Sequence, residues 1–473
     1  MKITQKQILF FSLLASLTLL LLIPAIRFLS NTPVLPGDAP YYHTRMAEYI
    51  RENSIPTQDP LIQRPYVLQP FHLILSLTNN IYLSSILITL SVGLLSIIVF
   101  YFILKKLEID LFKISVILLV LILSPLFIFL FSIPNQYAIA ILLILLGFLF
   151  FIKEKYFFIP SFIIFAVMPF FGILPSMISI CLLLIYTINN KSKLKYFYAT
   201  TAAILIILLA YYLPFIFHHG LPQITEFTRA NMLTNLIADL GSNIGFGIFN
   251  LLLALVGLYT LWKIKKQITA YLVLFFLIFL SYYLPQINIY LSFIAAIFAG
   301  YGFVSIIKMK WKIDLIKKLT IILIICGLLF STLSYINRFS HALPNKETIQ
   351  SLEWLKENSA TTDIIFSHHT KGQWIQAFSQ RPVILDSEIH YTPYLNTRFN
   401  DSNTTFYSRN LKATKPVLDK YNIKYIYIDQ EMKQGQVWTR KEQGLLFLFR
   451  NEETFKQVYT KEGIEIWEVL KQD

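Results

Sequence analysis

The chain is poor in cysteine, and both cysteines lie inside long apolar stretches. Only Cys181 and Cys326 occur among 473 residues. A disulfide framework or a cysteine metal cluster needs several cysteines at short spacings, so neither is predicted. The sequence also contains no glycine-rich phosphate loop, no His-Glu-x-x-His and no Gly-x-Ser-x-Gly elbow. Nothing therefore supports a nucleotide-handling enzyme, a zinc protease or an α/β-hydrolase.

Charged residues are scarce as well. They make up 14% of the chain, apolar residues make up 55%, and the mean hydropathy is +0.58. This composition is typical of a multi-span membrane protein. We predict about eleven transmembrane helices from apolar runs of sufficient length. They lie near residues 7–29, 82–104, 112–131, 137–152, 157–171, 173–188, 197–217, 243–262, 268–284, 288–307 and 319–337.

Most lysines of the apolar region fall in alternate loops. These are Lys2, Lys6, Lys105, Lys106, Lys153, Lys155, Lys191, Lys193, Lys195, Lys263, Lys265, Lys266, Lys308, Lys310, Lys312, Lys317 and Lys318. The positive-inside rule puts these loops and the N-terminus in the cytoplasm, and an odd helix count puts the C-terminal tail outside. We predict an integral multi-pass protein of a prokaryotic cell membrane. The net charge of +14 reflects this lysine bias, so no nucleic-acid partner is predicted.

The first large outward loop, residues 30–81, carries an acid, a histidine and arginines close to the predicted membrane surface. Such groups are costly beside lipid without a partner, and an enzyme acting on a lipid-linked substrate would place its chemistry there. Pro40 and the apolar spacing after it predict an amphipathic helix lying flat on the membrane. Asp38 precedes this helix, and local sequence favours a helix cap over a catalytic role. The guanidinium group of arginine suits phosphate binding, but contact with lipid headgroups is an equally good interpretation of any single arginine in this loop.

The composition changes after residue 338, where long apolar runs stop. Short apolar stretches at 363–367, 381–386, 423–429, 444–449 and 464–470 predict strands, and residues 411–420 predict a helix. Alternating strands and helices are typical of a small α/β domain. We therefore divide the chain into a transmembrane domain, 1–337, and a soluble extracytoplasmic α/β domain, 338–473.

The first outward loop carries a resemblance to a known family. Asp38, the pair Tyr41-Tyr42, His43 and Arg45 follow a pattern similar to that of the integral-membrane C-type glycosyltransferases (GT-C), especially the catalytic subunit of archaeal oligosaccharyltransferase. The aspartate lies one residue further from the aromatic pair than in that family. The resemblance covers nearly the whole chain and implies a GT-C-like helical membrane fold.

Two further stretches are similar to motifs of the same family. Ile224-Thr225-Glu226 resembles a short motif that ends in glutamate, and His368 to Asp386 keeps the frame of a Trp-Trp-Asp-Tyr-Gly motif without its Trp-Trp-Asp part. In relatives that part recognises the Ser or Thr of a glycosylation sequon, so a different acceptor is favoured. Asn135 and Gln136 stand where relatives keep an acidic pair, which implies a weaker metal site or none.

The resemblance implies inverting transfer of a sugar or oligosaccharide from a polyprenyl-phosphate or polyprenyl-diphosphate carrier to an acceptor on the outer face. The acceptor is a protein, a glycan or a lipid. The implied catalytic residues are Asp38 and Glu226, which are also candidate ligands of Mg²⁺ or Mn²⁺. The implied donor-phosphate residues are Arg45, Arg64 and His43, and the acceptor-side residues are His368, His369, Gly372, Trp374 and Asp386.

Two other functional classes stay open. A catalytically degenerate relative that binds a lipid-linked sugar fits the altered motifs. A transporter or flippase is disfavoured, because transporters keep ionisable residues near the bilayer midplane and the long apolar runs here hold almost none. For Asp59 and His72, which lie in the same outward loop, structural roles are favoured.

Overall fold

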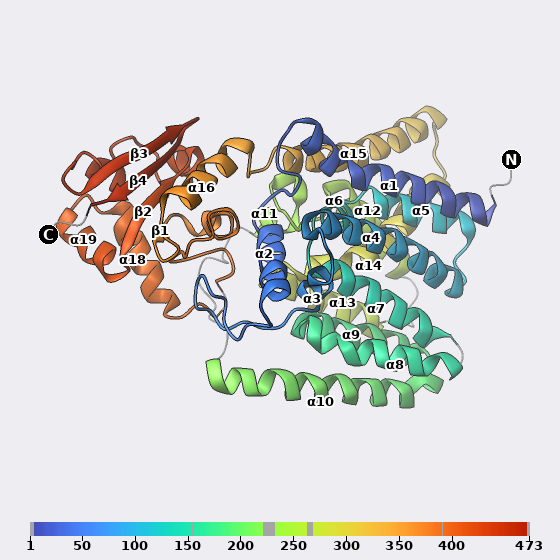
Figure 1. The fold of residues 1–473 in the computed structure, drawn as a ribbon. Helices are drawn as coiled ribbons and strands as arrows, with labels where there is room; N and C mark the ends of the chain where they lie inside the picture. The colour runs from blue at the N-terminus through green and yellow to red at the C-terminus, as the bar shows by residue number, and fades with distance from the viewer. Residues whose placement is uncertain (1–3, 154, 221–231, 263–267, 390, 471–473) are drawn as a thin grey trace.

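The fold is described from a computed structural model that covers residues 4–153, 155–220, 232–262, 268–389 and 391–470. A bundle of long helices forms one part of the molecule, and a smaller part containing a β-sheet follows it (Figure 1). The first ends with helix α15, Asp314–Ser340, and the second begins with α16, Lys346–Asn358. The two termini lie at opposite ends of the molecule.

Five described helices are long and apolar enough to cross a membrane: α1 Gln5–Leu29, α4 Ile81–Lys106, α10 Leu194–His219 with the turn before it, α14 Ile287–Lys308, and α15. A sixth span arises if α5, Leu111–Ile122, and α6, Pro125–Ser132, are joined across their 67° bend. Pro125 begins α6, where its missing N–H does no harm. The shorter apolar helices are α7 Tyr137–Ile152, α8 Phe158–Val167, α9 Ile173–Asn189, α12 Ile248–Trp262 and α13 Ile268–Ser281. Each expected range holds a helix, but only five or six qualify by length, so eleven spans are not confirmed.

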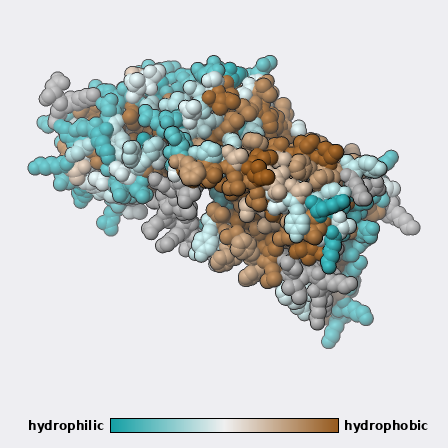
Figure 2. All heavy atoms as spheres, turned by 90° about the horizontal axis from the view of Figure 1, so that it is seen from below, coloured by the Kyte–Doolittle hydropathy of each residue, from teal (hydrophilic) through white to brown (hydrophobic). Residues whose placement is uncertain are grey.

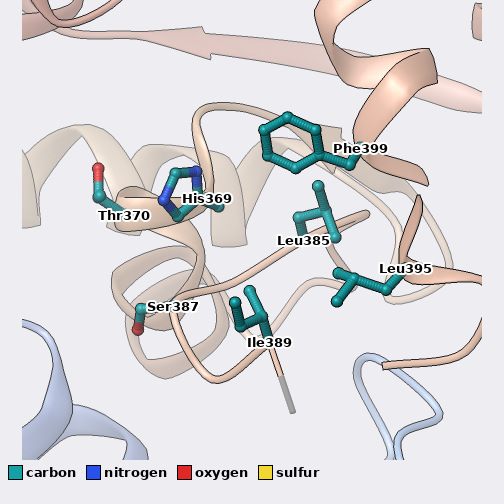
Figure 3. A pocket seen from close by; sticks show the side chains of 7 residues that line it. All are labelled: His369, Thr370, Leu385, Ser387, Ile389, Leu395 and Phe399. Atoms are coloured by element: carbon teal, nitrogen blue, oxygen red, sulfur yellow. The ribbon is translucent and has the colours of Figure 1, made fainter. Parts of the chain in front are cut away.

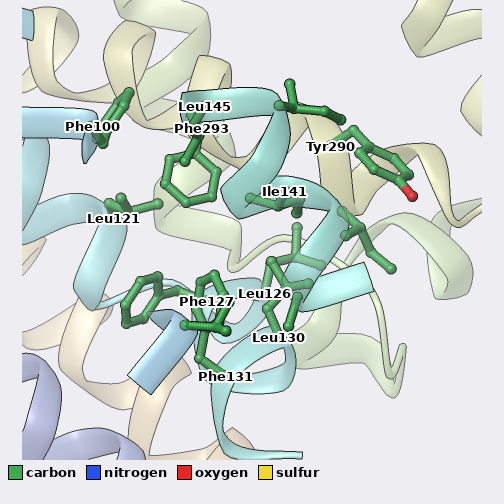
Figure 4. Close-up of a cluster of buried hydrophobic side chains, with 14 of the residues drawn as sticks. Phe100, Leu121, Leu126, Phe127, Leu130, Phe131, Ile141, Leu145, Tyr290 and Phe293 are labelled. Carbon is green, nitrogen blue, oxygen red and sulfur yellow. The ribbon is translucent and has the colours of Figure 1, made fainter. Parts of the chain in front are cut away.

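The bundle packs around aromatic and aliphatic side chains from α4, α5, α6, α7 and α14 (Figure 4). Small residues permit the closest approach, because a Cβ added at Gly257 of α12 would strike the Phe298 carbonyl of α14. Such small-residue contacts are characteristic of helix packing in membranes. Figure 2 shows hydrophobic residues gathered over the bundle and hydrophilic residues over the sheet-containing part. This distribution fits an integral multi-pass membrane protein.

The C-terminal α/β part contains a four-stranded sheet of order β1-β2-β4-β3. Strand β1, Ile364–Phe366, is parallel to β2, Ile423–Ile428, whereas β4, Ile464–Val469, is antiparallel to β2 and to β3, Phe455–Lys461. Helix α19, Leu411–Lys420, leads into β2 as predicted. The other elements of this part are the helical turn His369–Lys371, α17 Gly372–Trp374, the helical turn Ile375–Ser379, α18 Leu395–Tyr407, the helical turn Met432–Gln436 and α20 Leu445–Leu448.

Two strand predictions in this part were wrong. Residues 444–449 form α20, because a short apolar run does not distinguish a strand from a buried helical turn. Residues 381–386 contribute only one bridge, between Val383 and Ile365. Strand β3 was missed because most of its side chains are partly or fully exposed and its sequence is largely polar.

Residues 30–81 form α2, Ala39–Glu52, and α3, Pro70–Ser76, joined by an extended segment. The expectation that α2 lies flat on the membrane was wrong. Its residues 40–47 are all buried, and the helix packs against α3 and α4 on one side and α17 on the other (Figure 1). Both its polar and its apolar side chains therefore face protein. Helix α2 is the centre of the junction between the two parts of the chain.

Candidate active site

The chain segment that leads into α2 is fixed by Arg27 at the end of α1. This side chain is fully buried, and its guanidinium donates to backbone carbonyls on both sides of the junction. The acceptors are the carbonyl oxygens of Pro33, Leu35, Phe339, Ser340, Ala342 and Pro344. Each bond satisfies a carbonyl that burial would otherwise leave unpaired. Arg27 therefore ties the start of the loop to the end of α15.

Asp38 stands at the N-terminus of α2 and is half-buried. Its Oδ1 accepts a hydrogen bond from the Ala39 backbone N–H at 2.9 Å, so the helix cap expected from local sequence is present. Gly37, at φ +80°, donates its N–H to the Leu343 carbonyl at 2.8 Å and accepts from Trp374 Nε1 at 2.9 Å. Trp374, expected on the acceptor side, thus holds the backbone beside Asp38.

A buried network of four charges lies next to α2. Arg45 binds both carboxylate oxygens of Asp59, at 3.0 and 2.7 Å. Arg64 bridges Asp59 at 3.1 Å and Asp386 at 2.8 Å. Burial alone would raise the pKa of Asp59, but the charges and hydrogen bonds of Arg45 and Arg64 outweigh burial and hold it at about 2. Two positive and two negative charges therefore balance inside the junction.

This network changes the expected roles of three residues. Arg45 and Arg64 were expected to bind the donor phosphate, but their guanidinium groups are engaged by carboxylates. Arg45 also donates to Gln376 Oε1 at 2.9 Å, and Arg64 to the Glu388 carbonyl. Asp386 was expected to face the acceptor, yet it is fully buried and joins the α/β part to the loop. The sequence analysis did not predict this network, because ion pairs between residues far apart in the chain produce no local spacing pattern.

His43, also expected at the donor phosphate, belongs to a buried chain of hydrogen-bonding rings. Its Nδ1 lies 2.8 Å from His72 Nε2, and His72 Nδ1 lies 2.7 Å from the Tyr66 hydroxyl. Burial lowers the pKa of His43 to about 3 and lowers the pKa of His72 as well. Both histidines are therefore neutral at pH 7. His43 does not supply a positive charge, and His72 has the structural position favoured for it.

Glu388 was not identified from the sequence. Its N–H donates to Asp386 Oδ1 at 3.0 Å, and its carbonyl accepts from Arg64. The pKa of Glu388 is raised to about 7, chiefly by burial and less by the charges of Asp386 and Asp38, against the effect of Arg64. The available clue was its place two residues after Asp386, directly past a predicted strand.

A small cavity of about 130 Å³ is lined in part by Ser387 and Ile389, the two sequence neighbours of Glu388 (Figure 3). Its lining is mostly apolar and comprises His369, Thr370, Leu385, Ser387, Ile389, Leu395 and Phe399. Burial lowers the pKa of His369, and the negative charge of Asp38 opposes this effect, so the two side chains are within electrostatic reach. Of the expected acceptor-side residues, His369 thus lines a cavity near Asp38.

His368 and Gly372 contact residues that line this cavity. His368 Nδ1 lies 2.9 Å from Thr370 Oγ1, and its ring centroid is 4.1 Å from that of His369. A Cβ added at Gly372 would lie 2.6 Å from the Leu385 carbonyl oxygen. Glycine therefore allows α17 to pack directly on the segment that carries Leu385 and Asp386.

The expected metal site does not fit the described residues. Within the described ranges, no group of three or more His, Cys, Asp or Glu side chains could hold a metal ion. Glu226, the second expected ligand, lies outside those ranges. Asn135 Nδ2 donates to the Leu130 carbonyl of α6 and to the Ile133 carbonyl, and its Oδ1 accepts from the Ala138 N–H at 3.0 Å, so this amide is used structurally. The described residues alone do not make a site for Mg²⁺ or Mn²⁺.

No protein-family model and no curated protein matches the chain. Solved structures do match. An Archaeoglobus fulgidus oligosaccharyltransferase in complex with Zn and sulfate aligns over 98% of this chain and 73% of its own, with TM-score 0.65 and 16% identity. ArnT from Cupriavidus metallidurans bound to undecaprenyl phosphate aligns over 98% of both chains, with TM-score 0.59 and 8% identity. The chain has the GT-C glycosyltransferase fold.

A second archaeal structure extends this GT-C comparison. AglB from Archaeoglobus fulgidus, in complex with an inhibitory peptide and a dolichol-phosphate, has TM-score 0.62 and 14% identity, and covers 98% of this chain and 74% of its own. At such low sequence identities, the structural alignments establish only the fold. The chemistry has to be argued from the residues of this chain.

Proposed function

We propose that this GT-C protein is a membrane glycosyltransferase. It transfers a sugar or oligosaccharide from a polyprenyl-phosphate or polyprenyl-diphosphate carrier to an acceptor on the outer membrane face. The proposal rests mainly on the position of Asp38, which is fixed at the junction of the membrane bundle and the α/β part. The polyprenyl-type ligands of AglB and ArnT support a lipid-linked donor.

The reaction replaces the bond between sugar C1 and a phosphate oxygen by a bond between C1 and an acceptor atom. The C1–oxygen electron pair leaves with the phosphate, and the acceptor loses a proton to a base. Asp38 faces the acceptor in this proposal, oriented by its cap bond and by the Trp374 bond to Gly37. Glu226 is retained as an assisting carboxylate on the resemblance alone. No step is assigned to a metal, because the described residues do not fit one.

The departing phosphate needs positive charge close by. We assign the donor-phosphate role to Arg64. Its guanidinium is paired with Asp386, and its positive charge also acts on Glu388. It can bind a phosphate only if phosphate oxygens replace one of its carboxylate partners. Arg45 and neutral His43 support the wall of the site instead.

The acceptor is proposed to approach from the α/β part. The cavity lined by His369 is mostly apolar. The other expected acceptor-side residues do not line it, and we assign them a supporting role: Trp374, Gly372, His368 and Asp386. An apolar cavity near a carboxylate suits an acceptor that presents a hydroxyl or amide beside an apolar group. A protein, a glycan or a lipid remains an allowed acceptor class.

One observation favours a second candidate, a non-catalytic relative that binds a lipid-linked sugar. The two arginines best placed for phosphate are already paired with carboxylates, which suits a static scaffold. A transporter or flippase is a weaker alternative, since the charges described above gather at the junction. Activity measurements separate these alternatives.

The test is sugar transfer by purified full-length protein in detergent, supplied with polyprenyl-phosphate and polyprenyl-diphosphate sugars and with peptide, glycan and lipid acceptors. Asp38→Asn is compared with Asp110→Asn, which alters another helix-capping aspartate, on α5. We expect transfer by wild type and Asp110→Asn, and a loss of about 100-fold or more in Asp38→Asn.

A chelator arm shows separately whether a metal is required. Absence of transfer with every donor and acceptor would favour the binding-only alternative. Transfer that is unchanged in Asp38→Asn would keep the enzyme class and exclude the role assigned to Asp38.

A further inference from the structure

We infer that the helix bundle binds a membrane phospholipid with an anionic headgroup. One acyl chain fills an apolar cavity between the helices, and the phosphate lies among lysines at the end of the bundle that is remote from the α/β part. This binding site is separate from the junction, and it does not depend on the proposed transfer reaction.

A cavity of about 520 Å³ lies between helices α4, α7, α9, α12, α13 and α14. Its described lining is aliphatic and aromatic apart from Cys181 and Asn190, and contains no charged side chain. Along α14 the lining extends from Tyr290 to Tyr301, which corresponds to roughly 16 Å of helix. The cavity is therefore long enough to take up most of one extended acyl chain.

The cavity opens at the end of the bundle that is remote from the α/β part. Leu107, which follows α4, is 40% exposed, and Asn190, which follows α9, is partly exposed; both line the cavity. The end of α4 lies beside the start of α1, because Lys105 Nζ donates to Gln5 Oε1 at 3.0 Å. Figure 1 shows this start of the chain far from the α/β part.

The opposite end of the cavity is closed. Buried lining side chains gather there: Ile141, Ile144, Tyr290 and Leu291. The ring of Tyr290 contacts that of Tyr137, with centroids 6.4 Å apart, and Tyr137 is within electrostatic reach of Glu388. The closed end thus faces the junction. A donor lipid whose phosphate lies at the junction cannot insert its chain from that end, so the cavity is separate from the proposed donor site.

Lysines surround the open end. Lys106 directly precedes Leu107 and is within electrostatic reach of Lys193, on the turn between α9 and α10. Lys113 of α5 lies 5.2 Å from the ring centroid of Tyr301, which lines the cavity. The opening is therefore flanked by positive charge from three segments of the chain.

The carboxylates in these segments do not balance this charge. Residues 105–113 and 190–195 together hold six lysines and two acids, Glu108 and Asp110. Asp110 is already bound to Lys113 at 2.8 Å, whereas Lys193 Nζ donates only to a neutral group, the Lys153 carbonyl, at 2.5 Å. An anionic headgroup supplies the missing negative charge, since lysines at a membrane surface attract anionic lipids.

The apolar cavity selects the other half of the ligand. An empty cavity leaves its lining without dispersion contacts, and water finds few hydrogen-bond partners in it. Acyl chains are the apolar partner that a bilayer supplies in excess. A phospholipid with a net negative charge therefore matches both the cavity and the lysines at its opening.

The experiment is native mass spectrometry of the purified full-length protein in detergent. The protein is titrated with palmitoyl-oleoyl phosphatidylglycerol or with phosphatidylcholine of the same chains. We expect one phosphatidylglycerol to bind saturably, about tenfold or more tighter than phosphatidylcholine. Lys106→Gln should weaken phosphatidylglycerol binding about fivefold and leave phosphatidylcholine unchanged. The control Lys318→Gln, on α15, which does not line the cavity, should change neither.

A second pair of variants tests the place of the acyl chain. Leu182→Trp adds bulk to the cavity lining on α9 and should abolish saturable binding of both lipids. Leu209→Trp makes the same change at an exposed position of α10 and should leave binding intact. Thermal unfolding in detergent shows whether each variant is folded. If Leu182→Trp is not, Lys106→Gln decides alone, and unchanged phosphatidylglycerol affinity in that variant overturns the inference.

Three other results would overturn the inference. Equal affinity for the two headgroups would remove the role of the lysines. Binding that persists in folded Leu182→Trp, or that never saturates, would place the lipid on the outer surface of the bundle. Displacement of phosphatidylglycerol by undecaprenyl phosphate would assign the cavity to a polyprenyl chain. None of these measurements uses sugar transfer, so failure of the proposed function leaves the inference standing.

Discussion

The junction contains two pairs of carboxylates in different electrostatic settings. Asp59 and Asp386 are fully buried and bound by Arg45 and Arg64. In the other pair, Asp38 caps a helix with one oxygen, and the pKa of Glu388 is raised to about 7, chiefly by burial and less by the charges of Asp386 and Asp38, against the effect of Arg64. The first pair stabilises the junction, whereas a carboxyl group with a raised pKa is common at reactive sites.

The largest expected effect comes from breaking the paired set. Asp59→Asn leaves Arg45 and Arg64 buried without their shared counter-ion, and should lower the free energy of unfolding by about 3–5 kcal/mol. Thermal unfolding in detergent measures this loss. The control is Asp401→Asn, at an ion pair with exposed Lys420, where a much smaller loss is expected. Similar losses in both variants would contradict the structural role assigned to Asp59.

Acidification should destabilise the fold through His43. Its pKa is about 3 when folded and 6.5 in the reference state, so the unfolded chain binds more protons below pH 6.5. Stability should therefore fall from pH 7 to pH 5, by roughly 2 kcal/mol for this histidine. Asp59, at about 2 against 3.8, contributes a constant amount above about pH 5. Glu388, at about 7 against 4.5, titrates with the opposite sign and offsets roughly 2 kcal/mol over the same range. Burial also lowers the pKa of His72 and the pKa of His368, so these two histidines add to the loss and the net change on acidification is destabilising.

The measurement for this pH effect is thermal unfolding at pH 7, 6 and 5. His43→Gln should show a smaller acid-induced loss than wild type. His341→Gln, which alters an exposed histidine, should show the same loss as wild type. An unchanged pH dependence in His43→Gln would mean that His43 is charged in the folded protein.

A smaller effect is expected where the α/β part holds the backbone beside Asp38. Trp374→Phe removes the hydrogen bond to the Gly37 carbonyl and keeps an aromatic ring, so it should lower stability by about 1 kcal/mol. Transfer should fall about tenfold through kcat, because a small misplacement of a catalytic group is expensive. The matched control is Trp354→Phe, on α16. Equal kcat in both variants would show that Asp38 keeps its position without Trp374.

The smallest expected effect on stability separates the two carboxylate pairs most clearly. Asparagine caps a helix about as well as aspartate, so Asp38→Asn should change the free energy of unfolding by less than about 0.5 kcal/mol. Thermal unfolding of the variant prepared for the transfer assay checks this. A loss as large as that of Asp59→Asn would place Asp38 among the structural charges.

Local pattern predicted much of the fold. Helix α19 begins and ends where its sequence indicated, and β2 and β4 follow from their short apolar runs. The short apolar run at residues 444–449 was compatible with a strand and with a buried helical turn, and it forms α20. The helix cap formed by Asp38 was predictable, because capping depends on contiguous residues. The contact of Arg64 with Asp386 joins residues 322 positions apart, so no spacing rule could reveal it.

The contact of Arg64 with Asp386 also bears on how such proteins can be recombined. If the C-terminal part were a detachable recognition module, exchanging it between relatives would alter acceptor choice alone. Here the exchange would remove the counter-ion of a buried arginine and the glutamate next to it. A hybrid protein would also need a first outward loop that matches its C-terminal part. The loop that carries Arg64 and the segment that carries Asp386 therefore have to be exchanged together, although most of the chain separates them.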